Sequence, residues 1–151
     1  SGGVTEGREH RYAREIVASD PWIVFPGNLQ GRHARETGAK GATLVTLEDL
    51  GRARLEHRPL DVFRWATGTV DLTGAETSGE ALDRVRAGLE AEISGADGRG
   101  LGLRLRLWGA CPIHGEIAGG RERWTEEIRS LANGFGAAAP WIERIAFETA
   151  P

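Results

Sequence analysis

Residues 101–108 alternate strictly between leucine and another residue, and no other stretch of the sequence restricts the fold as strongly. The leucines share one face, while the opposite face carries Arg104 and Arg106. A period of two is that of a β-strand with one face on a core and the other in solvent. The stretch therefore predicts a strand in a sheet that is covered on one face.

Helical patterns lie on both sides of this strand. Before it, Thr77 followed by Glu80 is typical of a helix N-cap. An apolar stripe at helical spacing follows this cap, formed by Leu82, Val85, Leu89 and Ile93. After the strand, a second stripe predicts another helix that ends at Asn133-Gly134. Its members are Trp124, Ile128, Leu131 and Phe135.

Further strands are predicted at residues 63–72 and 141–147, with a short one at 112–117. The order from residue 61 is then strand, helix, strand, short strand, helix, strand. This order is that of the split βαβ, or ferredoxin-like, arrangement. We expect an α+β fold with a two-layer domain in which two helices cover one face of a small antiparallel sheet.

The first 60 residues have a different character. The apolar run 22–25 predicts a short buried strand, and the Pro-Gly-Asn that follows predicts a turn. Two more strands are expected at 42–47 and 53–60. Residues 1–9 are polar and rich in glycine, which favours a flexible lead-in. We therefore expect a boundary near residue 60.

The loop after the first of these strands concentrates polar and basic side chains. Guanidinium groups bind phosphate oxygens in a bidentate way, so this loop is a candidate phosphate or DNA contact. Its candidate residues are Asn28, Gln30, Arg32, His33, Arg35 and Lys40. Arg104 and Arg106 form a second basic row that could contact a DNA backbone. Two other interpretations stay open: the loop arginines pair with Glu36 and nearby acids, and the second row is simply solvated.

The residues PGNLQGRH and RE-x-G-x-KG, within positions 26–41, carry a family resemblance. They closely resemble the segment that follows the last metal-binding motif in SbcD-like DNA repair exonucleases of the calcineurin-like metallophosphoesterase superfamily. There, a strand and this turn lead out of the nuclease domain into a C-terminal capping domain. The resemblance implies that residues 10–60 are the last strands of a metallophosphoesterase domain and that 61–151 form an α/β capping domain.

The same resemblance implies a function. The family holds two divalent ions, usually manganese, with D-x-H, GD, GNH[DE], lone His and G-H-x-H motifs. The first four are absent here, and His10, the candidate metal ligand, preserves only one imidazole of the last. We expect a chain that is inactive by itself and holds no cofactor. It would help to position DNA in a parent manganese-dependent phosphodiesterase or exonuclease. The resemblance also implies an ABC-type ATPase subunit and a second copy of the same protein as partners.

Composition restricts the remaining possibilities. The net charge of −3 argues against a wholesale cationic nucleic-acid binder, and no apolar run approaches the roughly 18 residues that a membrane span needs. The single Cys111 cannot form an internal disulfide, so we expect a cytoplasmic protein. The chain begins Ser-Gly-Gly and lacks methionine, which favours a processed product or an excised fragment. The alternative is a free-standing ligand-binding or protein-interaction module with a ferredoxin-like sheet.

Overall fold

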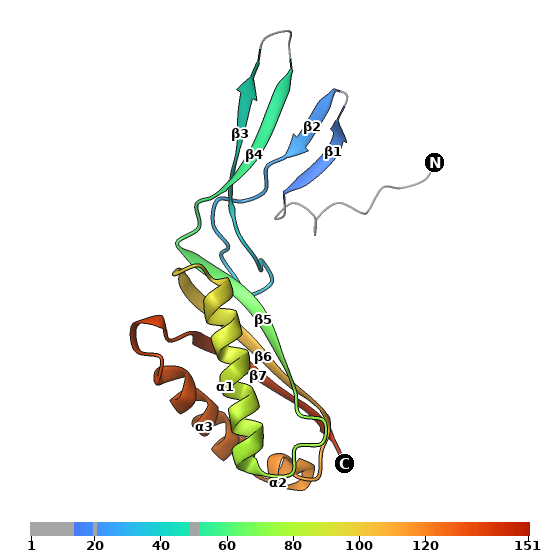
Figure 1. Cartoon of the computed structure of the whole chain (residues 1–151), viewed down its shortest axis with the longest axis vertical. Coiled ribbons are helices and arrows are strands. Elements are labelled where there is room, and N and C mark those ends of the chain that lie inside the picture. Colours follow the sequence, from blue (N-terminus) through green and yellow to red (C-terminus); the bar gives the residue numbers. More distant parts are fainter. Residues whose placement is uncertain (1–13, 20, 49–51) are drawn as a thin grey trace, which may run out of the picture.

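The computed structural model describes residues 14–19, 21–48 and 52–151. Two hairpins extend from one end of a sheet that is layered with helices (Figure 1). The strands are β1 (Glu15–Ser19), β2 (Trp22–Phe25), β3 (Gly41–Leu47), β4 (Ala53–Pro59), β5 (Phe63–Asp71), β6 (Gly100–Ala110) and β7 (Trp141–Ala150). The helices are α1 (Ser78–Gly95), α2 (His114–Gly119) and α3 (Arg121–Asn133), with a short 3-10 helix at Gly136–Ala138. No helix in the described ranges is long and apolar enough to cross a membrane.

Strands β5, β6 and β7 form one sheet, with β6 in the middle and every neighbouring pair parallel. The mixed α+β composition is confirmed, but the expected antiparallel sheet is wrong. Helix α1 joins β5 to β6, and α2 with α3 joins β6 to β7. Such a helical crossover returns the chain to the end of the sheet from which it started, so consecutive strands run in the same direction.

The predicted short strand at 112–117 is also wrong, because these residues lead into helix α2. The amide of Ile117 donates to the carbonyl of Ile113 at 3.0 Å, which closes one helical turn. Side chains four positions apart share a helix face, and this turn buries both isoleucines. An antiparallel sheet would have required β6 and a strand at 112–117 to form a hairpin. Because α2 follows β6 instead, that hairpin is not formed.

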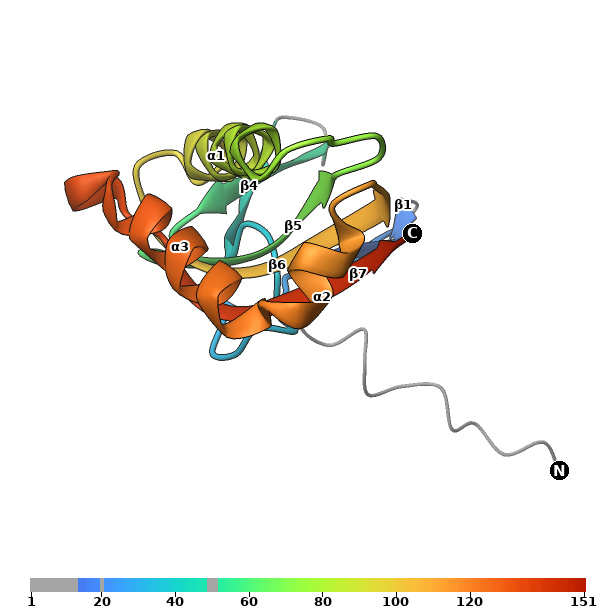
Figure 2. The ribbon, with the colours of Figure 1, turned by 90° about the horizontal axis from the view of Figure 1, so that it is seen from below.

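Helices α1 and α3 pack over the same face of the sheet (Figure 2). The expected cap is present, since the amide of Glu80 donates to the Thr77 hydroxyl at 3.2 Å. The alternate residues Leu103, Leu105 and Leu107 of β6 are buried beneath the helices, as the alternation predicted. Trp124 of α3 is the largest fully buried side chain. The core therefore lies between this sheet face and the two helices.

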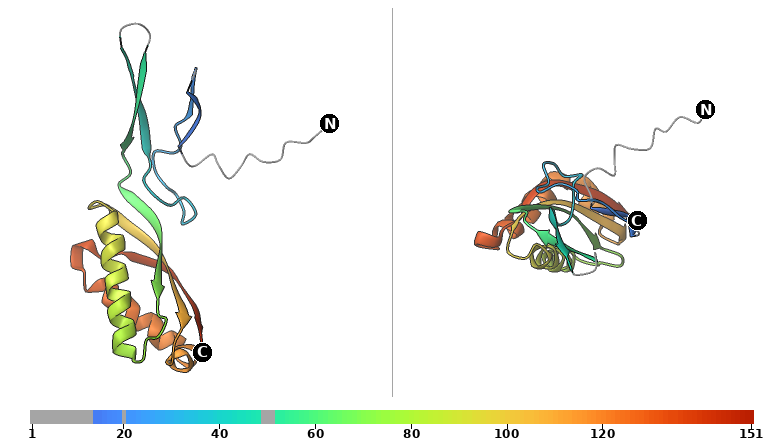
Figure 3. Two further views of the ribbon diagram at one scale, coloured as in Figure 1. Left: turned by 45° about the vertical axis from the view of Figure 1, so that its right-hand side comes forward. Right: turned by 90° about the horizontal axis from the view of Figure 1, so that it is seen from above.

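The hairpins β1–β2 and β3–β4 are antiparallel and extend beyond the sheet (Figure 3). Strand β2 forms where the apolar run predicted it, but the expectation that it is buried is wrong. Trp22 and Ile23 are 44% and 52% exposed. The described chain places no second layer over them.

Candidate functional site

The loop between β2 and β3, residues 26–40, is organised around the carboxylate of Glu36. This residue is 3% exposed, and its carboxylate accepts hydrogen bonds from Asn28 Nδ2 at 3.1 Å and from the Arg32 amide at 3.3 Å. His33 Nε2 lies 3.0 Å from the other carboxylate oxygen. A buried carboxylate that gathers donors from both sides of a loop fixes the loop backbone. Sequence reasoning treated Glu36 only as a charge opposing the arginines and missed this role.

A second set of contacts fastens the loop to the start of β5. Gln30 Nε2 donates to the Phe63 carbonyl at 2.5 Å, and Gln30 Oε1 accepts from the Val62 amide at 3.0 Å. The Gly38 amide also donates to the carbonyl of Trp65 at 2.9 Å. Gln30, a candidate contact for substrate, therefore has its amide group engaged by backbone.

Lys40, another candidate, is 7% exposed and points into the protein. Its Nζ donates to the Thr37 carbonyl at 2.8 Å, while its own carbonyl accepts from the amides of Leu60 and Asp61 at 2.9 and 3.2 Å. These contacts close the base of the loop. Lys40 is thus held in a position that stabilises the loop rather than one that presents its charge to solvent.

Arg32, His33 and Arg35 lie on the exposed side of the same loop. The His33 side chain is 51% exposed while it contacts Glu36. Within the described part of the chain, no ion pair involves the guanidinium of Arg32 or of Arg35. The structure therefore brings these three side chains together and leaves both guanidinium groups available for an anion.

A buried charge cluster lies where the hairpin region meets the sheet. Asp61 accepts from Arg64 Nε at 2.9 Å and from a second Arg64 nitrogen at 3.2 Å, and Arg99 Nε lies 3.2 Å from the same carboxylate. Burial alone raises the pKa of Asp61, but the hydrogen bonds and charge of Arg64 and the charge of Arg99 outweigh it and hold that pKa below its ordinary value. The hydrogen bond to Asp61 raises the pKa of Arg64. The cluster is therefore fully ionised at neutral pH.

The second basic row, Arg104 and Arg106 on β6, faces away from the helices as predicted. Each arginine is paired with a glutamate of β7: Arg104 Nε lies 2.6 Å from Glu143, and Arg106 Nε lies 2.5 Å from Glu148. The hydrogen bond from Arg104 lowers the pKa of Glu143. The row is therefore locally neutralised, unlike the exposed arginines of the loop.

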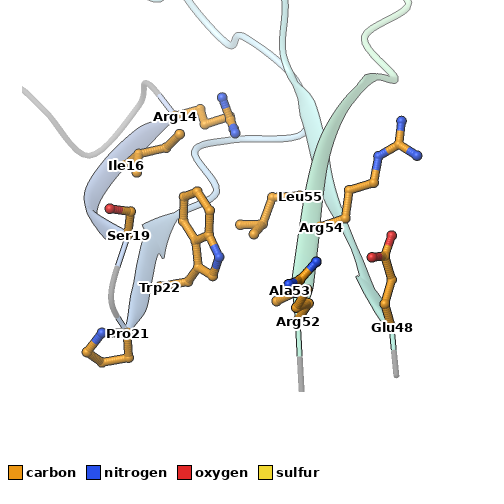
Figure 4. A pocket seen from close by; sticks show the side chains of 10 residues that line it. All are labelled: Arg14, Ile16, Ser19, Pro21, Trp22, Glu48, Arg52, Ala53, Arg54 and Leu55. Carbon is orange, nitrogen blue, oxygen red and sulfur yellow. The ribbon is translucent and has the colours of Figure 1, made fainter. Parts of the chain in front are cut away.

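A groove of about 910 Å³ lies between the two hairpins. In Figure 4, Trp22 of β2 and Leu55 of β4 extend toward each other across it, while Arg54 points to the other side of β4. The remaining lining residues are Arg14, Ile16, Ser19, Pro21, Glu48, Arg52 and Ala53. The groove is thus lined about equally by apolar side chains and by polar or charged ones, which include three arginines and Glu48.

Candidate metal ligands are sparse. His10 lies outside the described residues, and in the ranges 14–19, 21–48 and 52–151 no group of three or more His, Cys, Asp or Glu side chains is suited to hold a metal ion. Cys111 is buried, which raises the pKa of its thiol, and the His114 ring contacts the Thr149 hydroxyl at 3.0 Å. The described residues therefore do not fit a two-metal centre, and we assign no hydrolytic step to them.

Comparison with known proteins identifies the family. The family model "Metallophosphoesterase YhaO, middle domain" matches residues 65–150, from β5 to β7. A protein of Bacillus subtilis (strain 168) described as "Uncharacterized metallophosphoesterase YhaO" is 35% identical over 68 residues, which is 44% of this chain and 16% of that protein. The aligned part therefore spans about a sixth of this relative, and no solved structure matches. The expected metallophosphoesterase superfamily is confirmed, and the chain belongs to the family of the middle domain of metallophosphoesterase YhaO.

Proposed function

We propose that this chain is the region of an SbcD-like, metal-dependent DNA repair exonuclease in which the last strands of the phosphoesterase domain continue into a capping domain that positions DNA. The observation that carries the proposal is the loop at 26–40. It presents the guanidinium groups of Arg32 and Arg35 on a backbone that the buried Glu36 holds in place. Cations on a pre-ordered loop bind phosphate oxygens at a smaller entropic cost than cations on a mobile one.

The exposed hairpins support the assignment of residues 10–60 to a larger phosphoesterase sheet. Leu44 and Val45 are consecutive in β3, so they lie on opposite faces, and they are 48% and 53% exposed. A strand with apolar side chains on both faces is typical of a sheet that is covered on both sides. The remainder of a phosphoesterase domain would supply that cover, and residues 61–151 would then be the cap.

In this proposal the two-metal site belongs to residues outside the chain, with manganese as its metal. Arg32, His33 and Arg35 contact phosphates of DNA beside that site, whereas Gln30 and Lys40 keep the loop in position. Arg104 and Arg106 are weaker candidates because DNA would have to compete with their glutamate partners. An ABC-type ATPase subunit and a second copy of the protein are the proposed partners, in the cytoplasm.

Salt dependence of DNA binding tests the loop. Each phosphate contact contributes about 0.9 to the slope of log K against log salt concentration for duplex DNA. Arg32→Ala is therefore expected to reduce that slope by about 1. Arg58→Ala is the control, because Arg58 is an exposed arginine of β4 that pairs with Glu56. An unchanged slope for Arg32→Ala, or an equal reduction for both variants, would contradict the proposed contact.

A further inference from the structure

Three aromatic rings form a row across the sheet face that the helices leave uncovered. The Trp65 ring lies 5.4 Å from the Phe63 ring and 5.6 Å from the Trp141 ring, centroid to centroid, with edge-to-face geometry in both pairs. In the strand register, Trp65 pairs with Gly102 and Gly102 pairs with Trp141. The neighbouring Leu101 and Leu103 are buried under the helices, so the aromatic row lies on the opposite face.

Two glycines of β6 make room for this row. A Cβ atom at Gly102 would lie 2.6 Å from Cε3 of Trp65, and one at Gly100 would lie 2.8 Å from Cδ2 of Phe63. Real Cβ atoms essentially never come that close, so the rings occupy space that any other residue would fill. The rings therefore lie over the middle strand. Trp141, at the edge of the row, remains 59% exposed.

The basic loop adjoins this row. A Cβ atom at Gly31 would lie 3.2 Å from Cδ1 of Trp65, and the Gly38 amide bonds the Trp65 carbonyl. Arg32 directly follows Gly31, and its guanidinium has no ion-pair partner in the described ranges. Figure 3 shows the loop beside the start of β5, where the row begins. The aromatic row therefore lies beside a loop that carries a guanidinium group unpaired among the described residues.

We propose that this surface binds unpaired nucleotides of a nucleic-acid strand, with a base stacked on Trp141 and phosphates on the loop arginines. An aromatic ring beside uncompensated guanidinium groups combines the two contacts that single strands offer, a π-face and a phosphate. In a duplex the base faces are already stacked on one another, so a duplex uses the arginines but not the indole. The proposal rests on the proposed function, which brings DNA to the loop.

The test compares an oligothymidylate of about 12 nucleotides with a blunt duplex of the same length, both fluorescein-labelled, by fluorescence anisotropy with the full chain. Trp141→Ala is expected to weaken oligothymidylate binding by about 5- to 150-fold, which corresponds to the loss of one base–aromatic stack. Duplex binding should change less than about twofold. Trp141→Phe should retain most of the oligothymidylate affinity, because phenylalanine also offers a π-face.

Trp108→Ala is the matched control. Trp108 is also an exposed tryptophan on the same sheet face. It lies six positions further along β6 than Gly102, the register partner of Trp141, and this separates Trp108 from Gly102 by roughly 20 Å at about 3.3 Å per residue. Three results would overturn the stacking site. Trp108→Ala and Trp141→Ala could weaken oligothymidylate binding equally, Trp141→Ala could leave that binding unchanged, or the original chain could fail to bind oligothymidylate. Tighter binding of unrelated peptides than of oligothymidylate at Trp141 would also overturn the stacking site.

The two proposals can fail separately. If Arg32→Ala lowers the duplex salt slope while Trp141→Ala changes nothing, the stacking site is wrong and the phosphate contact stands. If Trp141→Ala weakens oligothymidylate binding while Arg32→Ala leaves the duplex slope unchanged, the stacking site stands and the duplex contact is wrong. The melting temperature of each variant reports whether folding is retained.

Discussion

Replacement of Asp61 by alanine is expected to destabilise the chain strongly, because it leaves two buried or half-buried cations without their main partner. The Asp61 side chain is fully buried, the Arg64 side chain is 9% exposed and the Arg99 side chain is 22% exposed. Removing one partner of a buried ion pair typically costs about 3–5 kcal/mol, since the other charge stays buried and uncompensated.

The structure indicates the lower end of that range. Without Asp61, one Arg64 nitrogen still donates to the Gly95 carbonyl at 3.0 Å and to Asp97 at 3.4 Å. We therefore expect a loss of about 3 kcal/mol in the free energy of unfolding. Combining Asp61→Ala with Arg64→Met should recover part of this loss, because the buried charge is removed together with its partner.

Urea unfolding followed by tryptophan fluorescence measures these values, since Trp124 lies fully within the core. Glu56→Ala serves as control, because Glu56 and Arg58 form an exposed pair with side chains 45% and 58% accessible. Such pairs contribute about 0.2–1 kcal/mol. The reasoning would be refuted if Asp61→Ala cost no more than Glu56→Ala, or if the double variant were less stable than Asp61→Ala alone.

Four further predictions concern pH, packing, the loop and added metal. The lowered pKa of Asp61 means that its contribution is present above its unfolded pKa of about 3.9 and is lost as pH falls through the lower folded value. The stability difference between the original chain and Asp61→Asn should therefore shrink between about pH 5 and pH 2 in urea titrations, and a difference that grew on acidification would contradict this sign. Gly102→Ala should destabilise the chain by about 1–3 kcal/mol, because the added Cβ meets the Trp65 ring. Gly115→Ala in α2 is the control in the same urea assay, and it should be neutral or stabilising by up to about 1 kcal/mol because open space surrounds Gly115. Gln30→Ala removes hydrogen bonds to the backbone at the start of β5, so amide hydrogen exchange at Val62 should accelerate while exchange in the middle of α3 stays unchanged. Added manganese is expected neither to raise the melting temperature of this chain nor to produce nuclease activity, and a metal-dependent rise would reveal a site within it.

Local sequence patterns predicted most of the helices and strands, but they did not predict how the strands are oriented relative to one another. The leucine alternation at 101–108 and the Thr77 cap each depend on a few neighbouring residues, and each forms as expected. The apolar stripe of α3 forms with Trp124, Ile128 and Leu131, whereas Phe135 lies beyond the end of the helix at Asn133. Strand orientation is a different kind of property, because it depends on how the chain returns between strands. The wrong prediction of a strand at 112–117 led to the wrong prediction of an antiparallel sheet, whereas the sheet is parallel.

The candidate site shows the same division. Sequence alone identified a basic loop and a basic row on β6, and residue type established that both carry positive charge. Only the tertiary structure decided that Glu143 and Glu148 neutralise the row, and that Arg32 and Arg35 have no such partner in the described chain. Those glutamates are about 40 positions from the arginines, so no local pattern could pair them.

What the sequence determined by itself is therefore the kind of most segments, with residues 112–117 as the exception, and the superfamily, because periodicity and short motifs depend on neighbouring residues. What the fold decided is which distant side chains meet: the carboxylate of Glu36 beneath its loop, and Trp65 beside Trp141 across a glycine of the strand between them. The physical reason is that burial and pairing are properties of surfaces, and those surfaces exist only once parallel strands and their helical crossovers have been packed together.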